Sequence, residues 1–115
     1  MTTPARAVLD RSMTERQWME TITEIGCIVC YRIGYRGTPA AVHHITSGGR
    51  RKSHLDTIPL CDPGHHKNSP TPRKISFHGN KVKFEDTYGT QEELLEYTKE
   101  VVKIEREIWN GARQP

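Results

Sequence analysis

Apolar side chains at helical spacing mark a first helix near the start of the chain. In the segment TERQWMETITEI they recur every three to four residues, as on one face of an α-helix. Thr14, followed by Gln17 three residues later, matches the capping box that begins many helices. Gly26 is a typical helix end. The pattern therefore predicts a short amphipathic helix with these apolar positions: Trp18, Met19, Ile22 and Ile25.

The segment TQEELLEYTKEVVKIEREIWNG predicts a longer amphipathic helix at the other end of the chain. Thr90 and Glu93 form a second capping box. Asn110–Gly111 is expected to end the helix. The predicted apolar stripe consists of Leu94, Leu95, Val101, Val102, Ile108 and Trp109.

Between these helices the pattern changes to short segments separated by turns. AAVHHI and DTIPLC each predict a short strand, and Pro59 makes the second an edge or irregular strand. TSGGRRKS predicts a glycine-hinged basic loop, and DPGHHKNS a turn that enters a short helix. NKVKFEDTYG predicts another short helix, with Asn80 as its cap and Gly89 as its end. The fold class is therefore expected to be α+β.

The composition indicates one small domain with a limited core. Only 34% of the 115 residues are hydrophobic, and chains this small and polar often need a metal or a disulfide for stability. We expect a flexible N-terminal arm over residues 1–13, a folded domain over 14–110 including the C-terminal helix, and a tail over 111–115.

The cysteine count argues against a secreted disulfide scaffold. Three cysteines are an odd number, and the N-terminus MTTPARAVLD lacks the apolar core of a signal peptide. No apolar run is long enough to cross a membrane, so a cytoplasmic location is expected. There, reduced cysteines indicate metal binding or catalysis. The net charge of +3 is compatible with a nucleic-acid partner.

The cysteines and one histidine have the spacing of a structural zinc site. Cys27 and Cys30 form a C-x-x-C knuckle. Cys61 and His65, separated by a Pro-Gly turn, could complete a tetrahedral set of three sulfurs and one nitrogen. A redox pair shares the C-x-x-C spacing, but the thioredoxin-like βαβ context is missing. A third interpretation is that the cysteines are simply small buried residues.

Histidines and cations supply further candidate functional residues. A doubled histidine between apolar residues is a poor choice for a core, because each buried ring needs a partner. His78 in FHGN is either a further metal ligand or phosphate donor, or a histidine of an ordinary loop. Basic side chains can grip a phosphate backbone without reading its sequence. The candidates are Arg50, Arg51 and Lys52, followed by Arg36, Lys67, Arg73 and Lys74.

The order of these motifs resembles the HNH endonucleases, also called ββα-metal nucleases. Its components are a C-x-x-C, a strand ending in His43–His44, a Gly-rich loop, the strand DTIPLC and a second His-His. The resemblance implies a small zinc-stapled ββα-metal domain with flanking helices. It also implies that His43 and His66 hold a catalytic ion, that His44 is the general base and that His65 is the fourth zinc ligand. Asp56 stands at the position of the family's middle Asn, and His54 is a second candidate for orienting the base.

A narrower resemblance is carried by HHITSGGRRKSHLDTIPLCDPGHH and SFHGNKVKFEDTYGTQEELL. These two segments, in this order, are similar to sequences of phage RecA-dependent nucleases of the recombination enhancement function type. The resemblance implies a metal-dependent DNA endonuclease acting in recombination or DNA processing, with DNA and a RecA filament as partners. It implies structural Zn²⁺ and a catalytic Mg²⁺ or Mn²⁺, and imidazole ligands could retain Zn²⁺ in purified protein. No base-reading helix is evident, so low sequence specificity is expected. The alternative is a non-catalytic zinc module that binds nucleic acid or protein.

Overall fold

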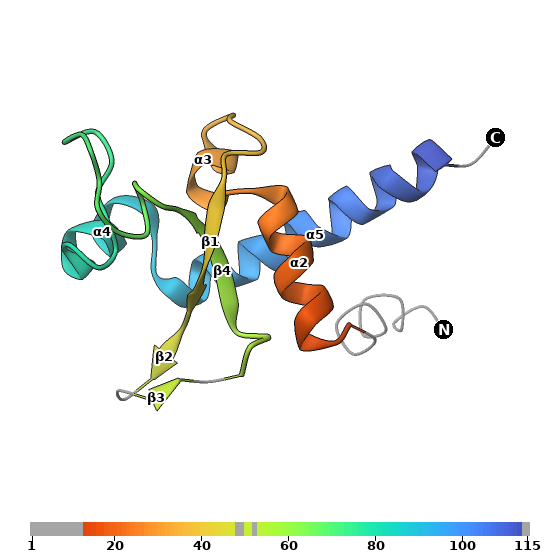
Figure 1. Ribbon diagram of the computed structural model, residues 1–115, viewed down its shortest axis with the longest axis horizontal. Helices are drawn as coiled ribbons and strands as arrows, with labels where there is room; N and C mark the ends of the chain where they lie inside the picture. The colour runs from red at the N-terminus through yellow and green to blue at the C-terminus, as the bar shows by residue number, and fades with distance from the viewer. Residues whose placement is uncertain (1–12, 48–49, 52, 114–115) are drawn as a thin grey trace.

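The structure is a computed structural model, and it describes residues 13–47, 50–51 and 53–113 (Figure 1). The predicted N-terminal arm, the Gly48–Gly49 hinge and Lys52 therefore lie wholly or largely outside the described residues. Met13, at the end of that predicted arm, is buried in the core. The elements in chain order are α2 (Glu15–Ile25), α3 (Ile28–Arg32), β1 (Ala40–His44), β2 (Thr46–Ser47), β3 (Arg50–Arg51), β4 (Thr57–Cys61), α4 (Lys81–Tyr88) and α5 (Gln91–Arg113).

A two-stranded antiparallel sheet lies at the centre of the molecule. β1 pairs with β4 so that His43 lies opposite Ile58 and His44 opposite Thr57. Because each strand of a two-stranded sheet has a free edge, Pro59 is accommodated without disrupting a further ladder. β2 and β3 form a separate short antiparallel pair beyond the end of β1 (Figure 1). The predicted basic loop is thus partly a hairpin.

The helices α2 and α5 cover the sheet and bury the core. Both have contacts with β4, and they pack against each other. The apolar faces predicted from the sequence account for much of this core, including Ile22, Leu94 and Val102, each of which is fully buried. The C-terminal half of α5 extends away from the rest of the molecule (Figure 1). No helix among the described residues combines the length and apolar character needed to cross a membrane.

The predicted helix ends are confirmed in three places. Thr14 begins α2 with a complete capping box, and Gly26 ends it. Asn80 caps α4 and Gly89 ends it. Thr90 Oγ1 accepts the Glu93 backbone N–H at 3.1 Å, and the Glu93 side chain accepts the Thr90 N–H at 2.8 Å.

Two predictions about helices are wrong. The segment DPGHHKNS contains turns and bends but no helix, because most of its backbone hydrogen bonds go to β4 and to residues 77 and 78, and the bond from Gly64 to Lys67 closes a turn and not a helical turn. The long helix does not stop at Asn110–Gly111 but continues to Arg113. A glycine lowers helix propensity by only about 1 kcal/mol, which the preceding turns can outweigh.

Candidate metal centres and the adjoining histidine pair

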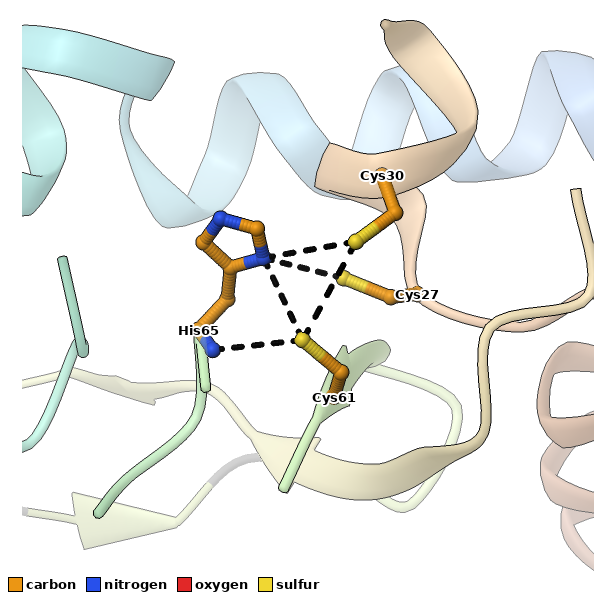
Figure 2. Close-up of side chains that lie close together, drawn as sticks. All are labelled: Cys27, Cys30, Cys61 and His65. Carbon is orange, nitrogen blue, oxygen red and sulfur yellow. Dashed lines mark hydrogen bonds between the residues drawn. The ribbon is translucent and has the colours of Figure 1, made fainter. Parts of the chain in front are cut away.

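The three cysteines and His65 form one buried cluster (Figure 2). Cys27 occupies the N-cap position of α3, and Cys30 lies within the helix. The C-x-x-C therefore brings both sulfurs to the start of this short helix. Cys61 is the last residue of β4, and His65 follows on the turn that leaves the strand. Segments separated by more than thirty residues in the sequence therefore supply the two halves of the cluster.

The distances within this cluster match those of a tetrahedral zinc site. Nδ1 of His65 lies 3.4 Å from the sulfur of Cys27, 3.6 Å from that of Cys30 and 3.3 Å from that of Cys61. The sulfurs of Cys30 and Cys61 are 4.0 Å apart. With Zn–S bonds of about 2.3 Å and a Zn–N bond of about 2.0 Å, a tetrahedron has S···N edges of about 3.5 Å and S···S edges of about 3.8 Å. These residues therefore fit a zinc ion.

Residues around Cys61 orient its sulfur and balance its charge. The backbone N–H of His65 lies 3.3 Å from this sulfur, and Nζ of Lys74 lies 3.6 Å from it. A Cβ on Gly64 would lie only 2.6 Å from the same sulfur, and Gly64 has a φ of +146°. Glycine is thus required here both by the backbone conformation and by the closeness of the sulfur.

The buried thiols differ in their affinity for protons. A hydrogen bond from Cys27 lowers the pKa of Cys61 to about 3, although burial acts in the opposite direction. The same hydrogen bond, together with burial, raises the pKa of Cys27. Burial lowers the pKa of Lys74, but the charges of the three cysteines and the hydrogen bond to Cys61 together outweigh it, and the pKa of Lys74 is raised. Negative charge therefore gathers at Cys61, beside the lysine.

The segment that carries the C-x-x-C is anchored to α5 through a buried carboxylate. Glu105 is only 5% exposed. The hydroxyl of Tyr31 donates to Glu105 Oε2 at 2.7 Å, and the guanidinium of Arg36 forms an ion pair with the same oxygen. Arg36, a candidate phosphate contact in the sequence, is therefore engaged within the fold.

A second cluster consists of His43, His66 and His78. One ring nitrogen from each residue lies within 4.8 Å of those of the other two. The Nε2 atoms of His66 and His78 face each other at 3.1 Å. Two imidazole nitrogens on one tetrahedral zinc would be about 3.3 Å apart. The cluster therefore has the dimensions of a metal centre, and the structure brings His78 into it.

Two polar side chains lie against rings of this second cluster. Oε1 of Gln91 accepts a hydrogen bond from Nε2 of His43 at 2.9 Å, which leaves Nδ1 of a neutral ring with a free lone pair. The buried Nδ1 of His66 lies 3.5 Å from Oδ2 of Asp62 and makes no hydrogen bond within the described part of the chain. Such outer partners orient metal-binding histidines in many proteins.

Burial favours the neutral form of His43 and His66. It lowers the pKa of His43 to about 4, although the hydrogen bond to Gln91 acts in the opposite direction. Burial and the neighbouring His78 also lower the pKa of His66, and Asp62 opposes this only in part. Neutral imidazole is the form that binds a metal, so these two residues are ready to bind at neutral pH without releasing a proton.

Backbone hydrogen bonds connect the two clusters directly. The N–H of His66 donates to the carbonyl of Cys61 at 2.9 Å. The N–H of Phe77 donates to the carbonyl of His65 at 2.8 Å, and that of His78 to the carbonyl of His66 at 3.1 Å. The turn after β4 therefore holds a ligand of each cluster, and His78 depends on that turn for its position.

His44, which follows His43 on β1, pairs with His54. Nε2 of His44 lies 2.8 Å from Nδ1 of His54, and their ring centroids are 5.0 Å apart. The backbone N–H of His54 donates to Glu15 at the start of α2, which fixes the loop that carries it. Asp56, the other candidate for orienting His44, lines a cavity together with Trp18 and other residues.

The candidate DNA-binding cations occupy different surroundings. β3 carries Arg50 and Arg51, while Lys67 and Arg73 are exposed on the turns after β4. Lys74 contacts the sulfur of Cys61 instead. Four of the cations proposed for DNA contact therefore lie on the hairpin or on exposed turns, and one is engaged at the first metal centre.

Sequence reasoning missed the partners of the metal-centre histidines. Asp62 stands four residues before His66, and this spacing could have indicated from the sequence that the two side chains meet. Gln91 is separated from His43 by 48 residues and stands at the start of α5, with no local pattern that marks it. The contact of Lys74 with Cys61 likewise spans an irregular loop whose path no periodicity predicts.

Comparison with known families gives one match. The family model described as recombination enhancement, RecA-dependent nuclease, matches residues 12–103. The matched region contains every residue of both clusters, the His44–His54 pair and most of α5. No curated protein matches the chain.

Proposed function

Because the chain belongs to the family of RecA-dependent nucleases of recombination enhancement, we propose that it is a DNA endonuclease with an HNH-type catalytic centre. In this proposal β1, β4 and α4 form the ββα-metal unit. The observation that carries it is the convergence of three imidazoles, together with a separate histidine pair whose His44 directly follows His43 on β1. This arrangement places one metal ligand, His43, and a proton acceptor, His44, on one short strand, β1.

The first centre would hold the structural ion. Cys27, Cys30, Cys61 and His65 offer a closed set of four ligands with no position for substrate, as is typical of structural zinc. The apolar core is small for a chain of this length, so such an ion would contribute much of the stability. Its catalytic value is indirect, since it fixes the turn on which His66 stands.

His43, His66 and His78 would hold the catalytic ion. Three protein ligands leave open coordination positions, as catalytic sites require. A divalent ion bound there supplies positive charge to the phosphoryl group and to the leaving oxygen. Nitrogen ligands favour Zn²⁺, Co²⁺ or Ni²⁺, whereas Mg²⁺ prefers oxygen. Gln91 and Asp62 orient two of the rings, so that their lone pairs are positioned before substrate arrives.

His44 would accept the proton of the attacking water. An imidazole with a pKa near its ordinary value of about 6.5 is suited to this task at neutral pH. The contact with His54 holds the ring in one orientation, which takes the place of the family's middle Asn. We therefore assign the positioning role to His54 and not to Asp56.

The proposed substrate is DNA, and the proposed partner is RecA. Arg50, Arg51 and Lys52, with Lys67 and Arg73, would contact phosphates and so bind DNA with low sequence specificity. The family description, a RecA-dependent nuclease of recombination enhancement, supports action on DNA that depends on RecA.

The experiment compares cleavage by matched variants in the presence of RecA filaments on DNA, with each divalent metal in turn. His44→Ala and His66→Ala should each reduce metal-dependent cleavage at least a hundredfold. Asp86→Ala, an exposed change on α4, is the control. Cleavage that persists unchanged in His44→Ala would remove the general-base assignment. A wild-type protein that binds zinc but cleaves no DNA under any of these conditions would favour the non-catalytic module.

A further inference from the structure

A cavity of about 300 Å³ lies between α2, α5 and the loop that precedes β4. Its lining combines apolar and charged side chains from three parts of the chain. The roles proposed above for the metal ligands and the general base do not use it. The lining residues are Trp18, Ser53, Leu55, Asp56 and Lys99.

The walls of this cavity are held in place before any ligand arrives. Nε1 of Trp18 donates to Oγ1 of Thr57 at 3.0 Å, so the indole cannot rotate freely. Oγ of Ser53 donates to Glu15 at 3.2 Å and accepts the backbone N–H of Leu55 at 2.8 Å. A preformed site loses little conformational entropy when it binds.

The cavity adjoins the His44–His54 pair. His44 lies directly opposite Thr57 in the sheet, and side chains opposite each other share one face. Thr57 in turn accepts the hydrogen bond from Trp18 in the cavity wall. His54, which contacts His44, stands in the chain between two residues that line the cavity. A nucleotide strand passing His44 therefore runs beside the cavity mouth.

The chemistry of the walls matches a nucleobase better than a phosphate or a hydrocarbon chain. The carboxylate of Asp56 would repel a phosphate, and a hydrocarbon would leave this carboxylate without a partner. Lys99 pairs with Glu96 at 3.4 Å and retains further N–H groups that can donate. A base has apolar faces for Trp18 and Leu55, and it has hydrogen-bond groups on its edge. The ammonium of Lys99 can donate to a ring nitrogen or carbonyl oxygen, while Asp56 can accept from an exocyclic amine.

We propose that this cavity binds one unstacked base of the DNA strand, next to the bond that is cut. The inference rests on the proposed nuclease function, which it extends to the substrate class. A base can enter a side-chain cavity only after it leaves its stack, so the preferred substrate is single-stranded or unpaired DNA. Adenine, cytosine and guanine carry the exocyclic amine that Asp56 would accept from, whereas thymine does not.

The first test uses Trp18 as the reporter and does not depend on cleavage. The chain has two tryptophans, so Trp109→Phe leaves Trp18 as the only fluorescent indole. Its emission is titrated, without added divalent ion, with single-stranded dA hexamers and with hexamers of abasic residues that carry the same phosphates. The dA hexamer should change the emission saturably, and the abasic hexamer should not. Equal responses to the two strands would overturn the proposal.

Two lysine variants on α5 provide the matched comparison. In the Trp109→Phe protein, Lys99→Met should weaken the dA response about fivefold or more, because the cavity loses its cation. Lys103→Met removes the same charge one helical turn away and should leave the response unchanged. Equal weakening by both variants would mean that the effect is general electrostatics, and the base site would be rejected.

Mapping of cut positions separates this proposal from the nuclease proposal. On RecA filaments with mixed-sequence DNA, Lys99→Met should redistribute the cuts, whereas Lys103→Met should keep the wild-type pattern. An emission response that depends on the base, in a protein that cleaves nothing, would support the base site and remove the nuclease function. Cleavage without such a response would do the reverse.

Discussion

Replacing His65 by alanine should unfold the domain, whereas replacing its neighbour His66 should leave the domain folded and inactive. His65 contributes the only nitrogen to the first cluster, and its Nδ1 lies within 3.6 Å of all three sulfurs. Its ring also packs edge-on against Tyr88 at 4.9 Å. The alanine variant loses the fourth ligand, leaves three buried sulfurs and removes this ring contact.

The expected magnitudes differ strongly. Zinc contributes on the order of 10 kcal/mol to small zinc-dependent domains, and a domain of this kind has a total stability of about 5–15 kcal/mol. The His65 variant should therefore have no stable folded state at 37 °C. The ring of His66 is neutral and packs against those of His43 and His78, with centroids 5.3 Å and 4.7 Å away. Losing such contacts costs about 1 kcal/mol, which the fold can tolerate.

Three measurements on both variants check this difference: zinc content per chain, thermal unfolding by circular dichroism, and cleavage of DNA on RecA filaments. His66→Ala should keep one zinc and a Tm within a few degrees of the wild type, without cleavage. His65→Ala should lose both zinc and the cooperative transition. A His66 variant that loses its zinc and unfolds, beside a His65 variant that keeps both, would exchange the two assignments.

Three further predictions follow from the surroundings of the two clusters. Gly64→Ala should lower the free energy of unfolding by about 2 kcal/mol or more in urea titration, because the new Cβ would meet the sulfur of Cys61 at 2.6 Å in a backbone conformation that alanine disfavours. Lys74→Met should speed zinc transfer to a competing chelator several-fold, with Lys74→Arg close to the wild type, because a charge-assisted contact to Cys61 is lost; equal rates for all three proteins would exclude that role. Since the pKa of His43 falls from 6.5 to about 4 on folding, unfolded chains bind a proton that folded chains exclude between these pH values, and stability must fall as the pH drops through this window. Between pH 7 and pH 5 the wild type should lose about 2 kcal/mol more than His43→Asn in urea unfolding, and parallel losses would contradict the argument.

Local patterns predicted the parts of the fold that depend on neighbouring residues. The ends of α2 and α4 were readable because Thr14, Gln17 and Asn80 bond to backbone groups within three residues of themselves. The Cys-x-x-C and the Cys61–His65 spacing predicted one cluster for the same reason, since each half is local. The false helix after Cys61 arose because turn residues resemble a helix start, while the carbonyls of His65 and His66 accept from residues 77 and 78 and not from a following helical turn.

The sequence by itself determined the helical faces, the caps, the four ligands of the first cluster and the resemblance to a nuclease family. Tertiary structure alone decided that His78 joins His43 and His66, that Gln91 bonds to the ring of His43, and that His54 lies against His44. These contacts join segments through irregular loops and the packing of α5, where side-chain periodicity carries no information about which distant residues meet. A motif can name the residue types that a site needs, but the buried partners that orient them are selected by the packing of the whole chain.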